Sequence, residues 1–298
     1  MKIQEALREI RSLKKKVQSL TTEIESIRTA SIEDPSPVEK MLRMRGVRVF
    51  RKNPTDRLFF PPDIPPFYKT RFYEMMKKYS FRLVLRDIIK YQDRFSIGDL
   101  THYCSSKVVQ GYCDLLCEMG VIVKKGRNSY RTRVSPLYSF GPTLEWFIAE
   151  MFKREFASPA IYGVSVKNTP SGGDYDVISS WNQRLVYVEA KSSPPKGIEQ
   201  NEISTFFSRM DDVLPDLAFL FNDTQLRMKD KLVVMFEGEM EKRYGRESET
   251  LYPVERVIEE LFHIQNRIFI VNSKKDVVEN FQICFKHYLQ CGNKKHRA

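Results

Sequence analysis

The sequence is poor in cysteine and has no long apolar run. Among its 298 residues are five cysteines and two tryptophans, and no apolar stretch approaches the roughly 18 residues that a membrane-spanning helix needs. The basic N-terminus lacks the apolar segment of a secretory signal, and an odd number of scattered cysteines argues against a disulfide framework. We therefore expect a cytoplasmic protein with reduced thiols and no membrane partner.

CxxC pairs are absent too, which argues against the common structural zinc sites. Cys113 and Cys117 lie at helical spacing, with His102 and Cys104 nearby. Zinc ligands usually come as closely spaced pairs of Cys or His. We therefore expect no zinc site among these four residues.

Acidic residues are scarce in the middle third of the chain. Residues 40–133 carry 21 Lys or Arg against 8 Asp or Glu, whereas residues 1–39 carry 7 against 7 and residues 134–298 carry 21 against 23. The whole positive excess of the chain, formally +11, therefore falls in one segment. Such segregation predicts a polyanionic partner, with a merely solvated basic surface as the alternative.

Residues 1–30 follow an unbroken heptad pattern. The a and d positions are held by Ile3, Ala6, Ile10, Leu13, Val17, Leu20, Ile24 and Ile27. β-Branched a positions, and opposite charges at Glu9 with Lys14 and at Glu23 with Arg28, favour a parallel two-stranded coiled coil and hence a homodimer. Packing of this helix on its own globular body is the alternative.

Residues 31–80 give the poorest signals. Two prolines and two acids between Ser31 and Pro37 are typical of a linker. The basic stretch "RMRGVRVFRKN" fits either a short strand or a basic arm. We expect a linker and basic arm over residues 31–80.

Residues 81–135 predict three helices followed by a basic hairpin. "FRLVLRDIIKYQ" has helical periodicity, residues 97–104 fit a short helix, and a third helix from Ser106 to Met119 ends at Gly120. This order resembles a winged helix-turn-helix domain and implies DNA as the partner. The resemblance places Lys107 and Gln110 on the recognition helix and five basic residues on the wing: Lys124, Lys125, Arg127, Arg131 and Arg133.

A helix and an antiparallel meander are expected next, with charges embedded in apolar sequence. "GPTLEWFIAEMFKREF" predicts a helix, and "PAIYGVSVKN", "DYDVISS" and "LVYVEAKSS" predict three strands joined by turns. Glu189 and Lys191 are two residues apart, so both project from one face of the third strand. Asp176 begins the partner strand, opposite them. Buried charges persist when they are paired or metal-bound, and two carboxylates with one lysine favour a hard divalent cation.

At these residues the sequence resembles the PD-(D/E)xK nuclease superfamily, which has the restriction-endonuclease-like fold. The resemblance implies an α/β (α+β) domain over residues 136–298, with a helix near 197–214 and strands "PDLAFLF" and "RIFIVNS" downstream. It implies metal ligation by Asp176, Glu189 and the Ala190 carbonyl, with Lys191 as the catalytic lysine. Glu145 is the supporting acid on the preceding helix, preferred to Glu150, and Asp174 is a rival to Asp176. The implied cofactor is Mg2+, with Mn2+ as the alternative.

Together these patterns predict a homodimeric, magnesium-dependent endonuclease that docks DNA through a basic winged helix. Two other interpretations are open: a DNA-binding regulator with an inactive nuclease-like domain, and an RNA nuclease. A surface ion pair between Glu189 and Lys191 is the non-functional alternative. The sequence also predicts helices in "QLRMKDKLVVMFEGEMEKRYG" and "DVVENFQICFKHYLQ", without a role for them.

Overall fold

The computed structural model describes residues 13, 16–17, 35–126, 128–133 and 136–294. It divides into two units, Met1–Ser36 and Pro37–Ala298. The coiled coil expected over residues 1–30 lies outside the described residues, apart from Leu13, Lys16 and Val17, which are helical. The second unit contains the sheet, the helices around it and all the predicted site residues.

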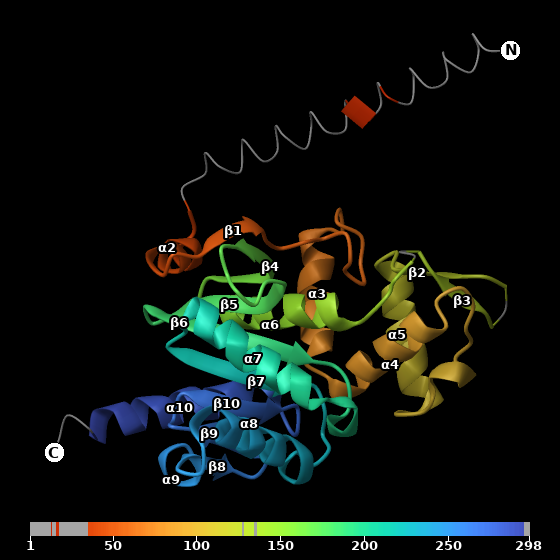
Figure 1. Ribbon diagram of the computed structural model, residues 1–298. Coiled ribbons are helices and arrows are strands. Elements are labelled where there is room, and N and C mark those ends of the chain that lie inside the picture. Colours follow the sequence, from red (N-terminus) through yellow and green to blue (C-terminus); the bar gives the residue numbers. More distant parts are fainter. Residues whose placement is uncertain (1–12, 14–15, 18–34, 127, 134–135, 295–298) are drawn as a thin grey trace, which may run out of the picture. The chain divides into compact units, whose positions relative to one another are not determined.

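An eight-stranded mixed sheet forms the centre of this unit (Figure 1), in the order β1-β4-β5-β6-β7-β10-β9-β8. Strands β4, β5 and β6 are an antiparallel meander, β6, β7 and β10 run parallel, and β9 and β8 return antiparallel. The bounds are β1 Arg48–Arg51, β4 Ala160–Lys167, β5 Asp174–Trp181, β6 Arg184–Lys191, β7 Leu217–Asn222, β8 Val254–Ile258, β9 Leu261–Ile264 and β10 Ile268–Asn272. The predicted mixed α/β class is thus confirmed.

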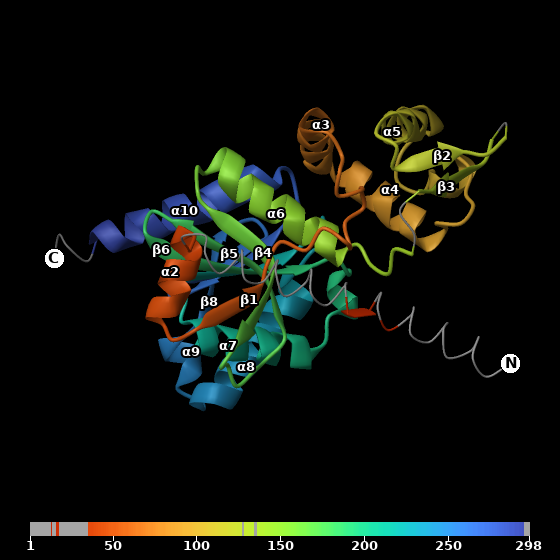
Figure 2. The same cartoon turned by 90° about the horizontal axis from the view of Figure 1, so that it is seen from above.

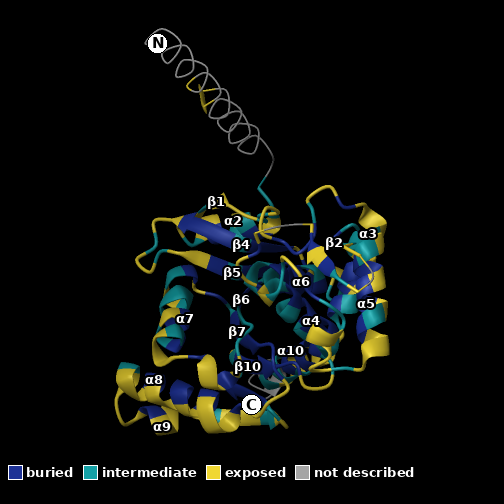
Figure 3. Ribbon diagram, turned by 90° about the vertical axis from the view of Figure 1, so that its right-hand side faces the viewer, coloured by how far each residue is buried: buried dark blue, intermediate teal, exposed yellow. Residues whose placement is uncertain are grey.

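Helices cover both faces of the sheet (Figure 2). Helices α6 (Gly141–Glu155) and α10 (Val277–Lys294) pack on one face, and α7 (Gln200–Val213) and α8 (Val234–Tyr244) pack on the other. Strand β6 explains why both faces are apolar: Val186 and Val188 join the core under α6, while Leu185 and Tyr187 join the core under α7. The central strands are accordingly buried (Figure 3). A run of apolar residues is expected for strands covered on both sides.

The helical segment that precedes α6 shares its core with the sheet. It consists of α3 (Pro66–Met76), α4 (Tyr79–Lys90), the short η1 (Gly98–Leu100), α5 (Ser106–Glu118) and the hairpin of β2 (Ile122–Lys124) and β3 (Tyr130–Thr132). Phe72 of α3 packs against Trp146 of α6, with ring centroids 5.8 Å apart. Residues from both parts belong to one continuous apolar cluster. The apolar core therefore continues across the expected domain boundary between residues 135 and 136.

A buried ion pair also joins the two parts. The Nε of Arg82, on α4, donates to both carboxylate oxygens of Asp223 at 3.0 Å, and both side chains are 0% exposed. Arg86 and the Ser273 hydroxyl donate to the same carboxylate. Asp223 follows β7, and its backbone N–H donates to the carbonyl of Lys191 at 2.8 Å. The helical segment thus contacts the end of the strand beside Lys191.

Three segments differ from the sequence expectations. Residues 31–80, expected as linker and basic arm, contain α2 (Pro37–Met44), the edge strand β1 and α3. The helix expected over residues 97–104 is one turn, η1, which starts with the Asp99 carboxylate accepting from the backbone N–H of Ser96 at 2.7 Å and is followed by the Thr101 hydroxyl donating to the Gly98 carbonyl at 2.9 Å. Strands β8 and β9 lie in a stretch where the sequence predicts no strand. Both strands are short, and β8 carries Glu255 and Arg256 next to each other, so the strand alternation is weak.

The other expected elements downstream are present. The helix expected near 197–214 is α7, and the strands expected in "PDLAFLF" and "RIFIVNS" are β7 and β10. The two C-terminal helices are α8, preceded by a π-helical turn (η3, Lys229–Val233), and α10; a short helix, α9 (Ser248–Leu251), follows α8. Within the described residues, no helix has the length and apolarity needed to cross a membrane.

Gly163 in β4 is required by its surroundings, and we expect Gly163→Ala to destabilise the protein. Its φ is +53°, and an added Cβ would lie 2.7 Å from Cγ and Cδ of Pro54. The left-handed backbone costs an L-residue about 1–2 kcal/mol, and the collision adds about 1–3 kcal/mol. Urea unfolding should therefore show a loss of roughly 2 kcal/mol or more.

Gly238→Ala is the matched control for this variant. Gly238 lies inside α8, and an added Cβ there meets nothing within 4 Å. Alanine should stabilise this helix by up to about 1 kcal/mol. Equal effects of the two substitutions would contradict the close approach of Pro54 to β4.

Candidate active site

A tight turn fixes the register that brings the predicted site residues together. Asn182 and Gln183 connect β5 to β6 with φ of 47° and 59°, the positive values that a two-residue hairpin turn requires. The turn pairs Trp181 with Arg184, and Val177 consequently pairs with Val188. Asp176 therefore lies beside the end of β6, and its Oδ2 accepts from the backbone N–H of Ala190 at 2.7 Å.

Glu189 and Lys191 lie on the face of β6 that α7 covers. The Glu189 side chain is only 3% exposed, and the Lys191 Nζ is 3.0 Å from its Oε1. The same Nζ is 2.9 Å from Oε1 of Glu202, on the first turn of α7. Lys191 is thus held between two carboxylates. This burial does not fit a surface ion pair at a fraying strand end.

Arg209, on the third turn of α7, completes the group. Its Nη1 donates to both oxygens of Glu189, at 3.0 and 2.8 Å, and the Tyr187 hydroxyl donates to one of them. Sequence reasoning missed both Arg209 and Glu202. A seven-residue spacing puts them on one face of a helix, but nothing local shows which face meets the sheet.

Glu145, on α6, lies near the same group. An ideal Cβ on Gly163 would lie 3.6 Å from its Oε2, an ordinary contact distance, so the carboxylate lies directly against β4. Glu150, the less favoured acid, instead pairs with Lys153 and Arg154 on the surface of α6. Asp174, the rival of Asp176, is exposed and accepts a hydrogen bond from Ser165.

Burial and neighbouring acids raise the pKa of two of these carboxyl groups, Glu145 and Asp176. Burial raises the pKa of Glu145 to about 7, with added repulsion from Glu189 and Asp174. Burial also raises the pKa of Asp176, and the charges of Glu189 and Glu145 raise it further. For Lys191 burial lowers the pKa, but Glu189 and Glu202 outweigh it and the net shift is upward. If all three carboxyl groups are ionised, the negative charge of Asp176, Glu189 and Glu145 exceeds the positive charge of Lys191 and Arg209 by one.

The acids are not arranged as a finished metal site. Among the described residues, no three Asp, Glu, His or Cys side chains surround a common point in a way that would hold an ion. The contacts of Glu189 explain this, because Arg209 and Lys191 occupy its oxygens. Cys104, Cys113 and Cys117, the three cysteines near His102, are free thiols.

The structure places the expected DNA-binding residues on α5 and the β2–β3 hairpin. Most are exposed: Lys107, Lys124, Lys125, Arg131 and Arg133. Gln110 is half-buried and donates to Asp114 at 2.7 Å and to the Tyr130 hydroxyl at 3.3 Å, so its amide is already engaged. Arg127 lies outside the described residues.

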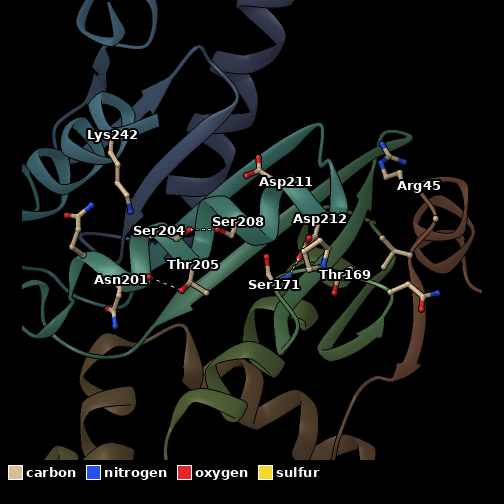
Figure 4. A pocket seen from close by; sticks show the side chains of 15 residues that line it. Arg45, Thr169, Ser171, Asn201, Ser204, Thr205, Ser208, Asp211, Asp212 and Lys242 are labelled. Atoms are coloured by element: carbon tan, nitrogen blue, oxygen red, sulfur yellow. Dashed lines mark hydrogen bonds between the residues drawn. The ribbon is translucent and has the colours of Figure 1, made fainter. Parts of the chain in front are cut away.

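A polar groove of about 1000 Å3 runs along the outer side of α7 (Figure 4). Its walls come from α7, the β4–β5 turn, the residues just before β1 and Lys242 of α8. Hydroxyl and amide groups such as those of Asn201, Thr205 and Ser208 line it, and Arg45 and Lys242 are balanced by Asp211 and Asp212. A groove without net positive charge offers no attraction for a phosphate backbone. We therefore assign it no part in substrate binding.

Comparison with known proteins gives a fold similarity and no family. No family model matches the chain, and no curated protein matches it. Protein VC1899 from Vibrio cholerae is similar in structure, with a TM-score of 0.50 and 12% identity over 84% of this chain and 62% of that one. The chain thus spans less than two thirds of VC1899. Can2 from Sulfobacillus thermosulfidooxidans, solved with cyclic tetra-adenylate, gives a TM-score of 0.40 and 16% identity over 64% of this chain and 52% of Can2, which is too weak to carry an argument. The VC1899 similarity concerns the fold alone.

Proposed function

We propose that this protein is a metal-dependent nuclease that hydrolyses phosphodiester bonds in DNA. One observation carries the proposal: in the β5–β6 hairpin the Asp176 carboxylate accepts from the backbone N–H of Ala190, the residue between buried Glu189 and half-buried Lys191. An Asp, a Glu and a Lys in this order, on two paired strands, are the residues expected from the PD-(D/E)xK resemblance. Glu189 is buried and the other two are half-buried, and charged groups clustered in this way are more typical of a functional site than of a solvated ion pair.

The residues fit a hard divalent cation in their chemistry. Carboxylate oxygens of Asp176, Glu189 and Glu145 are the ligands that Mg2+ and Mn2+ prefer, with the Ala190 carbonyl as a further oxygen. The excess negative charge of the group also favours a cation. Bound there, a divalent metal would activate water and stabilise charge on the phosphoryl group. To bind it, Glu189 must give up its contacts with Arg209.

The chain's own residues supply orientation and charge. The Ala190 N–H holds the Asp176 carboxylate in place, and Lys191 is the catalytic lysine that orients the attacking water or stabilises the developing negative charge. Glu202, on α7, holds the lysine ammonium group, with 2.9 Å between Nζ and Oε1. Arg209 is close enough to compensate a phosphate once Glu189 is released.

DNA docking is assigned to the helical segment. The order α4, η1, α5 and the β2–β3 hairpin supports the expected winged helix-turn-helix, in which α5 would be the recognition helix. Exposed lysines and arginines on α5 and the hairpin suit phosphate contacts, which position a duplex without reading its sequence. The N-terminal heptads support a homodimer, and two sites in one dimer would suit cutting both strands.

The test is cleavage of supercoiled plasmid by the full-length protein. We expect nicking or linearisation with magnesium or manganese and none with EDTA. A matched single-stranded RNA distinguishes the RNA nuclease, which would cut RNA in preference to plasmid. A protein that binds DNA but cuts neither nucleic acid with either metal is the regulator, and the catalytic proposal then fails.

A further inference from the structure

The two edge strands of the sheet differ in charge. Figure 1 shows β1 and β8 at opposite edges, and they bound the strand order on either side. Strand β1 has the sequence RVFR, with two arginines and no acid, whereas β8 has the sequence VERVI, in which one arginine and one glutamate cancel. Part of the basic excess of residues 40–133 therefore lies on the sheet edge and not on the β2–β3 hairpin.

Two arginines on the β1 side have no acidic partner among the described residues. Arg43 and Arg48 line a groove of about 520 Å3, here called the β1 groove, together with Glu39, Gly46, Val49 and Asn168. Glu39, the acid in this groove, pairs with Lys52 at 2.6 Å. Both arginines are exposed. A groove that presents two uncompensated guanidinium groups fits phosphate, which arginine recognises by paired N–H donors.

An exposed aromatic ring and a further cation continue this surface. Phe50 of β1 is 59% exposed, and the Lys167 Nζ lies 5.4 Å from its ring centroid. Lys167 is paired in register with Arg48 across β1 and β4. Cations interleaved with an exposed aromatic ring are typical of surfaces that bind nucleic-acid strands.

The surface leads to the candidate active site. Directly after β1, Asn53 bonds to Tyr162 of β4 in both directions, with its N–H donating at 2.7 Å and its side chain accepting at 3.0 Å. This fastens Pro54 against Gly163, next to Glu145. Arg57 is close enough to lower the pKa of Glu145, against the larger effect of burial. A strand lying along β1 would therefore end at the acids.

We propose that the β1 edge binds the sugar–phosphate backbone of the nucleic-acid strand that enters the active site. Arg43 and Arg48 contact its phosphates, and Phe50 lies against a sugar or base. This rests on the proposed function and adds a second contact surface to the winged helix. It accounts for the lack of acid on β1, which β8 does not share.

The test is binding in EDTA, where cleavage plays no part. Fluorescence anisotropy with a labelled duplex and a labelled single strand is measured for Arg43→Glu/Arg48→Glu over a range of salt concentrations. We expect at least about tenfold weaker binding for one or both ligands at about 0.1 M salt, and a log–log salt slope shallower by about 1.8, from two lost phosphate contacts. Arg43→Gln/Arg48→Gln, which removes charge without adding acid, should give a smaller loss in the same direction.

The control changes the net charge equally at the other edge. Arg246→Glu/Arg256→Glu replaces two exposed arginines, Arg246 after α8 and Arg256 on β8. Binding within about twofold of wild type is expected for this variant, because only nearby charges act at this salt. Equal losses in both double variants, or none in either, overturn the proposal. The two proposals can fail separately. If plasmid is never cut but the β1 variants alone lose binding, the proposed nuclease activity is wrong and nucleic-acid binding by the β1 edge is supported.

Discussion

Asp176→Asn is expected to lower the plasmid cleavage rate by about 10³-fold while leaving the fold intact, because one preorganised charged group at such a site contributes about 10²–10³-fold. An asparagine oxygen can still accept from the Ala190 N–H, which is 2.7 Å from Asp176 Oδ2. What is lost is the negative charge. The rate of supercoiled plasmid loss with magnesium measures the effect.

Asp174→Asn is the matched control, two residues away on the same strand. Asp174 is exposed, and its pairing with Ser165 survives as a hydrogen bond to the amide oxygen. We expect its rate to stay within a few-fold of wild type. Full activity in Asp176→Asn together with loss in Asp174→Asn would transfer the role to the rival acid.

Asp176→Asn should also change the free energy of unfolding. We expect the variant to lose activity but to gain stability. Burial, Glu189 and Glu145 raise the pKa of Asp176, so its ionised form opposes folding at neutral pH. This cost is present above the folded-state pKa and vanishes as pH falls below the unfolded-state value near about 3.9. The asparagine variant should therefore be more stable than wild type at pH 7, and the gain should disappear in acid. A destabilised variant at pH 7 would indicate a structural acid.

Asp223→Ala is expected to destabilise the protein by about 3–5 kcal/mol, since it leaves a buried charge without its partner. Arg82 is 0% exposed, and Asp223 is the carboxylate that its guanidinium meets. Glu118→Ala is the control, because it breaks an exposed pair with Arg71 that is worth at most about 1 kcal/mol. Urea unfolding measures the loss of stability in both variants. Similar losses would mean that the buried Arg82–Asp223 pair stabilises the protein no more than the exposed Arg71–Glu118 pair.

The pH dependence of this difference follows from the net pKa shift. Burial raises the pKa of Asp223, but Arg82 and Arg86 outweigh burial and leave the pKa below its ordinary value. A lowered folded-state pKa gives stability that is present above the unfolded-state pKa and lost as pH falls through the folded-state one. The gap between wild type and Asp223→Ala should thus be constant from about pH 5 to 8 and narrow below about pH 4.

The hairpin of the candidate site was predictable because local sequence determines it. The apolar runs of β5 and β6 indicate two strands, the Asn182-Gln183 turn sets their register, and the register brings Asp176 beside the end of β6 that carries Glu189 and Lys191. Their partners on α7 were not predictable. Arg209 lies 18 residues beyond Lys191, and its contact depends on how a whole helix packs on the sheet. The same holds for Asp223, whose partner Arg82 is 141 residues away in sequence.

Edge strand β1 was left undecided by the sequence for a different reason. Its four residues do not alternate between apolar and polar in a way that marks a buried face. All of them except Val49 are exposed. What makes it a strand is pairing with β4, in which Arg48 aligns with Lys167. The sequence therefore could not distinguish a short strand from a basic arm within residues 38–66. The pairing of β1 with β4, more than 100 residues away along the chain, shows that it is a strand.

The shared core of α3, α4 and α6 limits how this chain can diversify. A DNA-docking module joined by a linker can be exchanged for another without disturbing the catalytic part. Here, removal of the helical segment would expose Trp146 and Phe147 and leave Asp223 without its arginines. Under the proposed function, new target preferences would therefore arise by surface substitutions on α5 and the β2–β3 hairpin, because replacement of the whole segment would uncover part of the core that it shares with the sheet.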